Sequence, residues 1–272
     1  MIDSRRVGTL AGETRVLEVQ GPNAERPVLL FHGNPGNAND WKPFLERLEG
    51  RRRALAPDLL GWGESDRPKS FRWTMEALAS WVGDLIDALE VAQYDLVVHD
   101  WGSIALVTSA RRPQAVGRMA VMNAVPLVPE YRWHWVARLW RRRGVGEALN
   151  AITSKFGTRQ LLRQSVMNPD ARLELSDLIH AHFDRGTKRA ILDLYRDADP
   201  EKFIPIAESL ARLTGPALVV WGDADPYLGL EFADRIAAAL AGEARVDHVP
   251  GAGHWPWLDR PEVVGTVCDF LA

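Results

Sequence analysis

Cysteine and long hydrophobic runs are nearly absent from this chain. Its 272 residues include one cysteine, Cys268, so no disulfide can form within it, as is usual for proteins of a reducing compartment. No apolar run approaches the roughly 20 residues that span a bilayer. Arg5 and Arg6 stand near the start, but glycines and charged residues follow them where a signal peptide has its apolar segment. We therefore expect a cytoplasmic protein with no signal peptide and no membrane partner.

An excess of one charge, metal-ligand clusters and phosphate-binding loops are also missing. With 33 Lys and Arg against 36 Asp and Glu, the formal net charge of −3 gives no reason to expect a nucleic-acid partner. His180 and His182 are two residues apart, so on a helix they would not face one metal ion. No glycine-rich dinucleotide or phosphate motif follows a strand. We expect no metal and no cofactor, and the sequence leaves a homodimer open.

Strand-like and helix-like segments alternate along most of the chain. Hydrophobic residues make up 46% of the sequence, enough for a large core. Short apolar or alternating runs predict strands at residues 7–10, 14–20, 28–31, 53–56, 94–98, 119–122, 217–221 and 244–249. Helical patterns lie between most of them. This order predicts an α/β fold with a mostly parallel sheet covered by helices on both faces.

The alternation stops in the middle of the chain. Residues 125–213 contain no strand-like run, only helix-like segments rich in Arg, Leu and Trp. We interpret this block as a helical cap inserted into one sheet domain, which consists of residues 1–124 and 214–272.

The turn that follows the strand at residues 94–98 carries the most informative residue. There the chain reads His99-Asp100-Trp101-Gly102 and continues into a helical pattern. A sharp strand-to-helix turn with one residue at its tip is a nucleophile elbow, in which esterases place a serine. Attack by the Asp100 carboxylate on an acyl carbon would give a mixed anhydride, whereas attack on a saturated carbon gives a stable ester that water can hydrolyse. The substrate class predicted is therefore an alkylating carbon, in a halide or an epoxide.

A base and its orienting acid follow at the ends of the last two strands. His254 lies in Gly253-His254-Trp255, and Asp223 and Asp225 lie in Gly222-Asp223-Ala224-Asp225-Pro226. The carboxyl ends of parallel strands meet at one sheet edge, where open α/β sheets bind ligands. The order nucleophile, acid, histidine is that of α/β-hydrolases. At the end of the third strand, Asn34 in His32-Gly33-Asn34-Pro35 stands where a second oxyanion-hole N–H is expected, beside the N–H of Trp101.

Together these motifs resemble the haloalkane dehalogenase and epoxide hydrolase branch of the α/β-hydrolases, over almost the whole chain. Asp58-Leu59-Leu60-Gly61-Trp62-Gly63-Glu64-Ser65 belongs to the same pattern. The resemblance implies an α/β-hydrolase fold, with a mostly parallel eight-stranded sheet, flanking helices and an inserted helical cap. It also implies that Asp100 is the nucleophile, that Asp225 rather than Asp223 orients His254, and that His254 activates water. Asn123 stands near the strand end where some dehalogenases carry a glutamate for that role.

The resemblance leaves two reactions open. Haloalkane dehalogenases hold the leaving halide with two N–H donors, which here would be the side chains of Trp101 and Asn34. Epoxide hydrolases protonate the opening ring with cap tyrosines, and the segment around Tyr195 is similar to their last cap helix. Tyr131 is the other cap tyrosine, and Trp140 stands where the partner of Tyr195 is expected. Either enzyme would take a small hydrophobic organic substrate and water. A binding protein of this fold without turnover is a third hypothesis.

Overall fold

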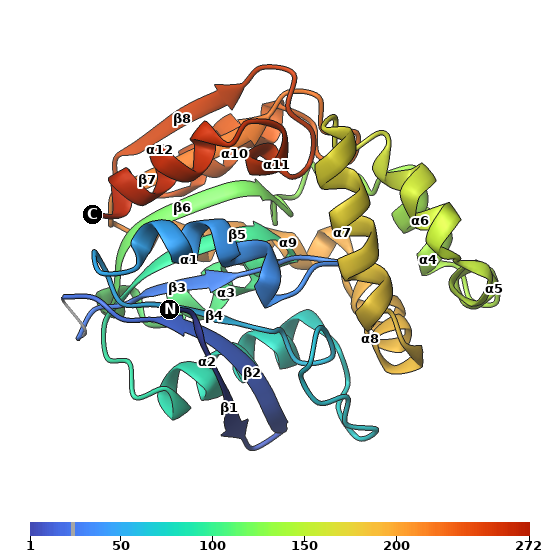
Figure 1. Cartoon of the computed structure of the whole chain (residues 1–272), viewed down its shortest axis with the longest axis horizontal. Coiled ribbons are helices and arrows are strands. Elements are labelled where there is room, and N and C mark those ends of the chain that lie inside the picture. The colour runs from blue at the N-terminus through green and yellow to red at the C-terminus, as the bar shows by residue number, and fades with distance from the viewer. Residues whose placement is uncertain (23–24) are drawn as a thin grey trace.

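The computed structural model describes residues 1–22 and 25–272 and has one eight-stranded sheet at its centre (Figure 1). The strands lie in the order β1-β2-β4-β3-β5-β6-β7-β8. The pairs β1/β2 and β2/β4 are antiparallel, and the others are parallel. Their bounds are β1 (Asp3–Thr9), β2 (Gly12–Val19), β3 (Val28–Phe31), β4 (Ala54–Pro57), β5 (Tyr94–Asp100), β6 (Val116–Ala124), β7 (Ala217–Gly222) and β8 (Ala244–Val249).

Every predicted strand is present, and the largest difference is at the edge of the sheet. β1 begins at Asp3 rather than Val7, and Leu10 lies in the turn, 97% exposed. Residues 3–6 are exposed polar side chains on an edge strand, so hydrophobic periodicity does not detect them. The central strand β5 is buried along its whole length, which is typical of a parallel strand covered on both faces.

Two helical layers cover the sheet, because successive strand residues point to opposite faces. Leu29 and Phe31 pack in the apolar cluster of α2, α3 and α10, whereas Val28 and Leu30 pack in that of α1 and α12. The bounds are α1 (Lys42–Leu48), α2 (Met75–Ala88), α3 (Ile104–Arg111), α10 (Glu231–Ala239), α11 (Pro256–Asp259) and α12 (Glu262–Leu271).

Between β6 and β7 the chain contains helices and, in the structure, no strand. They are α4 (Trp135–Arg141), α5 (Val145–Ile152), α6 (Lys155–Leu162), α7 (Pro169–His182), α8 (Arg185–Asp197) and α9 (Phe203–Leu210). Figure 1 shows α4 to α8 standing beyond one edge of the sheet, while α9 packs against α3 and α10. This is an α/β-hydrolase fold, as expected. Among the described residues, no helix has both the length and the apolar character needed to cross a bilayer.

Candidate active site

Asp100 stands at the tip of a strained turn at the end of β5. Its backbone has φ 47° and ψ −121°, and a short 3₁₀ turn (Trp101–Ser103) leads from it into α3. A positive φ is uncommon for a residue with a Cβ and persists only where the surroundings enforce it. Gly102 allows the turn, because a Cβ there would collide with the carbonyl of Phe31. The strain therefore presents the Asp100 side chain above the sheet edge.

The Asp100 carboxylate is buried and hydrogen-bonded. Its Oδ1 accepts the backbone N–H of Asn34 at 2.7 Å, and its Oδ2 lies 3.6 Å from Nε2 of His254. Burial alone would raise the pKa of this carboxyl, but the hydrogen bond and charge of His254 outweigh it, so the pKa is lowered. Asp100 is thus an ionised carboxylate at neutral pH.

His254 links Asp100 to Asp225. Its Nδ1 lies 2.7 Å from Oδ2 of Asp225, so Nδ1 carries the proton and Nε2 faces Asp100. Burial disfavours the imidazolium, but the charge of Asp225 and the hydrogen bond with Asp100 overcome it and raise the pKa of His254. Asp223 does not contact His254; its Oδ1 accepts the N–H of Gly251.

Asp225 is held by donors on both oxygens. Oδ1 accepts the N–H groups of Tyr227 (2.8 Å) and Leu228 (3.2 Å), and Oδ2 accepts Nδ2 of Asn123 (2.7 Å) as well as His254. Asn123, whose Oδ1 accepts the N–H of Gly222, therefore joins the ends of β6 and β7. From the sequence we expected Asn123 only to mark where the acid is not found, although its position at a strand end signals this contact.

The cap fixes the loop that carries His254. The N–H of His254 donates to the carbonyl of Ser165 at 2.8 Å. Asp259 accepts the N–H of Gly253 (2.8 Å) and the N–H of Met167 (2.7 Å), so it joins the loop to the chain between α6 and α7. His99 supports it from below, with Nε2 2.8 Å from the His254 carbonyl.

A cavity of about 450 Å³ opens onto this site beneath the cap. Asp100, His254, Asn34 and Tyr195 line it. The rest of its wall is mostly apolar and comes largely from α4 to α8, including Trp135, Val136, Leu139, Trp140, Leu149, Ile152, Phe156, Leu161, Leu162, Ile179 and Phe183. An apolar chamber with few polar groups fits a small hydrophobic molecule.

Donors gather on one side of Asp100. Trp62 donates its indole N–H to Oδ1 of Asn34 at 3.1 Å, so the other end of that amide, the donor Nδ2, is not used by Trp62 and lies toward the phenol oxygen of Tyr195. The indole N–H of Trp101 is buried with no hydrogen-bond partner among the described residues. Trp101 does not itself line the cavity; Tyr195, edge-on to it at 5.4 Å between ring centroids, does.

The phenol of Tyr195 is neutral at neutral pH. Burial and the charge of Asp100 raise its pKa, and the opposing influence of the Trp101 and Asn34 side chains on the phenol oxygen is weaker. Trp140 packs on its ring at 5.0 Å. Tyr131, by contrast, does not line the cavity: it is buried against Trp133 and Phe232. The structure therefore brings Tyr195 to the site and leaves Tyr131 outside it.

His134 and Tyr227 also line the cavity and were missed from the sequence. Their rings are 4.8 Å apart, and Tyr227 lies edge-on to His254 at 5.4 Å. Burial lowers the pKa of His134 to about 4. Its Nδ1 accepts the N–H of Ala137 (3.3 Å), so the neutral ring carries its proton on Nε2. Tyr227 could have been predicted from the sequence, because it stands two residues after Asp225.

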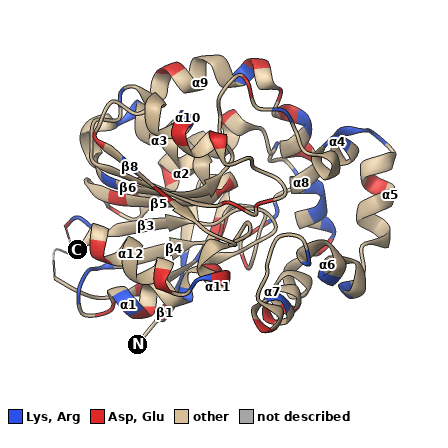
Figure 2. Cartoon of the chain, turned by 90° about the horizontal axis from the view of Figure 1, so that it is seen from above, with Lys and Arg blue, Asp and Glu red and all other residues tan. Residues whose placement is uncertain are grey.

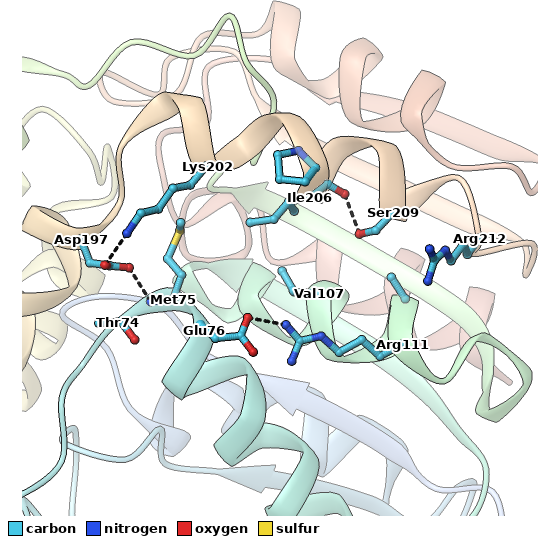
Figure 3. Close-up of a pocket in the computed structure, with 12 residues that line it drawn as sticks. Thr74, Met75, Glu76, Val107, Arg111, Asp197, Lys202, Ile206, Ser209 and Arg212 are labelled. Atoms are coloured by element: carbon cyan, nitrogen blue, oxygen red, sulfur yellow. Dashed lines mark hydrogen bonds and ion pairs between the residues drawn. The ribbon is translucent and has the colours of Figure 1, made fainter.

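A second hollow, of about 500 Å³, lies between α2, α3 and the chain from Asp197 to Arg212 (Figure 3). Four of its charged side chains form two ion pairs, Arg111 with Glu76 and Lys202 with Asp197. None of Asp100, His254 and Asp225, which we call the triad, lines this hollow. Within the described chain, no three His, Cys, Asp or Glu side chains are grouped as a metal site would require.

Comparison with known proteins places this chain in one family. The model of the α/β hydrolase fold family matches residues 26–261. A haloalkane dehalogenase of Mesorhizobium japonicum is 28% identical over 89% of this chain and 83% of its own length. Epoxide hydrolase 3 of Xenopus tropicalis is 27% identical over 90% and 71%. A crystal structure of a haloalkane dehalogenase from Bradyrhizobium elkani superposes with a TM-score of 0.84 at 26% identity, covering 100% of this chain and 98% of that one.

Proposed function

Because this chain belongs to the α/β hydrolase fold family, in the branch of haloalkane dehalogenases and epoxide hydrolases, we propose that it hydrolyses carbon–halogen bonds through an ester on Asp100. The family and the hydrolase class come from the comparisons. The nucleophile, the leaving group and the residue roles are argued from the site.

In the first step, one oxygen of Asp100 attacks the carbon that bears the halogen. The new C–O bond forms as the C–X bond breaks, and its electron pair leaves with the halide. The lowered pKa keeps Asp100 ionised for this attack. The N–H of Asn34 holds Oδ1, so Oδ2 on the His254 side is the freer oxygen.

In the second step, water attacks the carboxyl carbon of the ester. His254 accepts a proton from that water through Nε2, and Asp225 stabilises the imidazolium at Nδ1. The N–H of Asn34, already on Asp100, stabilises the oxyanion. Collapse breaks the bond to the alkyl oxygen, which takes the proton held by His254 and leaves as the alcohol. Asp100 returns as a carboxylate with one oxygen from water, and the second proton of that water passes to solvent.

The observation that carries the halide assignment is the indole N–H of Trp101, which is buried, makes no hydrogen bond of normal geometry with the described residues and faces the phenol oxygen of Tyr195. Buried polar groups are nearly always hydrogen-bonded, so an orphaned donor beside a nucleophile needs an explanation. A halide ion accepts such donors without needing a proton. Asn34, with its Oδ1 tied to Trp62, supplies a second N–H on the same side of Asp100.

A second candidate, epoxide hydrolysis, is favoured by the position of Tyr195. Its phenol lines the cavity and stays protonated, as a donor to an opening epoxide must. With Tyr131 outside the cavity, the other phenol that lines it and could assist is Tyr227.

The ester itself is tested with His254→Ala, which allows the first step and stops the second. Incubation with a short bromoalkane should leave the alkyl group on Asp100, visible as an adduct in intact-protein mass and peptide mapping. His248→Ala changes an exposed histidine of β8 and should form no lasting adduct. An unmodified His254→Ala protein, with bromoalkanes and epoxides alike, would overturn the mechanism; ligand binding without turnover would then identify a binding protein.

Tyr195→Phe separates the two leaving groups. If the substrate is a halide, the variant keeps at least about a third of the rate of halide release; if it is an epoxide, diol formation falls at least about a hundredfold, in the range of general acid catalysis. Tyr131→Phe is the matched control, because its hydroxyl is buried outside the cavity. Release of halide and formation of diol are measured side by side on both variants.

A further inference from the structure

One part of the cap carries a local excess of positive charge. Residues 131–168 contain eight Arg and Lys and a single acidic residue, Glu147, although the whole chain carries a net charge of −3. Figure 2 shows basic residues, in blue, on α4, on α6 and on the connection between α4 and α5. Among the described residues, Arg138, Arg142, Arg143 and Arg163 are exposed and have no ion-pair partner.

The same part of the chain exposes large apolar side chains. Phe156 is 77% exposed, Ile152 75% and Trp135 49%. All three also line the active-site cavity, so they form its rim toward solvent. On α4, Arg138 follows Trp135 by three residues and therefore lies on the same helix face. Arg163, the residue that ends α6 in helical conformation, follows Phe156 by seven residues, two turns along the same face.

Exposed apolar side chains among unpaired arginines are the pattern of a surface that lies in a membrane interface. The apolar groups enter the boundary between headgroups and acyl chains, and the cations attract anionic lipids. We propose that this basic rim (Trp135, Arg138, Arg142, Arg143, Ile152, Phe156 and Arg163) docks reversibly on an anionic bilayer, with the cavity mouth toward the lipid.

Such docking departs from the expectation of no membrane partner, which rested on the lack of a spanning apolar run, because reversible docking needs no such run. It would also place the cavity where hydrophobic organic molecules partition. Nucleic acid suits the charge but gives no reason for three exposed apolar side chains at the cavity mouth.

The test is co-sedimentation of the full chain with vesicles in low-salt buffer. Vesicles of phosphatidylcholine and phosphatidylglycerol in equal parts should bind at least about tenfold more protein than pure phosphatidylcholine vesicles, and added salt should remove most of the difference. No sedimentation above the lipid-free control with either vesicle would overturn the proposal.

Paired variants locate the surface. Ile152→Ser should lower binding at least about threefold, whereas Ile204→Ser, on α9 and 47% exposed, should not change it. Arg142→Gln with Arg143→Gln should lower binding at least about fivefold, whereas Arg72→Gln with Arg212→Gln, two exposed arginines elsewhere, should have little effect. Equal losses in variants and controls would contradict the proposed surface. The proposal would also be contradicted if the protein without lipid were a dimer and Ile152→Ser dissociated it, because the rim would then bind a second copy of the chain.

Discussion

Trp101 and Trp133 are neighbouring stacked indoles that differ in one hydrogen bond. Their ring centroids are 5.6 Å apart; Trp133 donates its N–H to the carbonyl of Ala198 at 2.9 Å, and Trp101 donates to no described residue. A hydrogen bond to a charged group contributes about 1.5–3 kcal/mol. We predict that Trp101→Phe slows halide release at least about tenfold, measured on a short bromoalkane.

Trp133→Phe is the control for that substitution. It removes a structural hydrogen bond and should lower stability by about 1 kcal/mol, with less than a threefold effect on halide release. If Trp101→Phe stays within twofold of the wild type, Trp101 has no role in holding the leaving group.

Asp40 is a buried carboxyl whose ionisation destabilises the folded protein to an extent that depends on pH. Neither of its oxygens has a hydrogen bond of normal geometry among the described residues. Burial and the charge of Asp58 outweigh the opposing influence of the Asn37 backbone and the Trp255 side chain and raise its pKa to about 7. Between about pH 4 and pH 7 the unfolded chain has lost this proton and the folded chain keeps it. Stability therefore falls as pH rises through that window, by up to about 4 kcal/mol, and is level above it.

We predict that Asp40→Asn removes most of this dependence. Urea unfolding at pH 5 and pH 8 should show a smaller loss of stability for the variant than for the wild type. Asp269→Asn is the control, because the pKa of this exposed carboxyl is lowered and it stays ionised over the whole range. Parallel curves for Asp40→Asn and wild type would show that Asp40 ionises normally in the folded chain.

At the level of elements, the elbow depends on a residue without a side chain. A Cβ on Gly102 would strike the carbonyl of Phe31, whereas Gly265 in α12 has open space around it. We predict that Gly102→Ala destabilises the protein by at least about 2 kcal/mol, the cost of overpacking, and abolishes turnover. Gly265→Ala should stabilise it by about 0.5–1 kcal/mol through helix propensity. Denaturant unfolding of both variants and the wild type measures these changes in the free energy of unfolding.

The sequence predicted helices and strands where hydrophobic periodicity is strong. It did not predict which residues face the cavity, because tertiary contacts determine that. β5 and the turn at Asp100 follow from a buried apolar run and a glycine two residues on. Neither pattern reveals which face of a cap helix meets the cavity, because the cap packs against the sheet edge through contacts distant in sequence. Hence Tyr195 was placed with Tyr131, though one lines the cavity and the other does not. His134 was missed because its surroundings come from other elements.

Across the whole molecule, the parallel sheet explains why the triad could be anticipated. Asp100, Asp225 and His254 each follow a strand, and parallel strands end at one edge, so chain order and strand ends suffice to gather them. The links between the strand ends were not predictable in the same way. The bond from Asn123 to Asp225 and the anchoring of the His254 loop to Ser165 depend on distances of a few ångströms that no periodicity encodes.

The charge balance of the assembled triad predicts how turnover depends on pH. In the free protein His254 lies between two carboxylates, which raise its pKa. Ester formation neutralises Asp100, so the pKa of His254 falls at the stage where it must act as a base. Below that pKa the imidazolium cannot accept a proton from water and hydrolysis slows, while attack by Asp100 continues because its own pKa is lowered.

The ester should therefore accumulate in acid. We predict that the wild type, quenched during turnover of a bromoalkane, carries several-fold more alkyl adduct at about pH 5 than at about pH 8. Intact-protein mass measures the fraction, and His254→Ala should be alkylated equally at both pH values because it has no group that titrates as the base. An adduct fraction that is the same at both pH values in the wild type would mean that His254 is not the group whose ionisation controls ester hydrolysis.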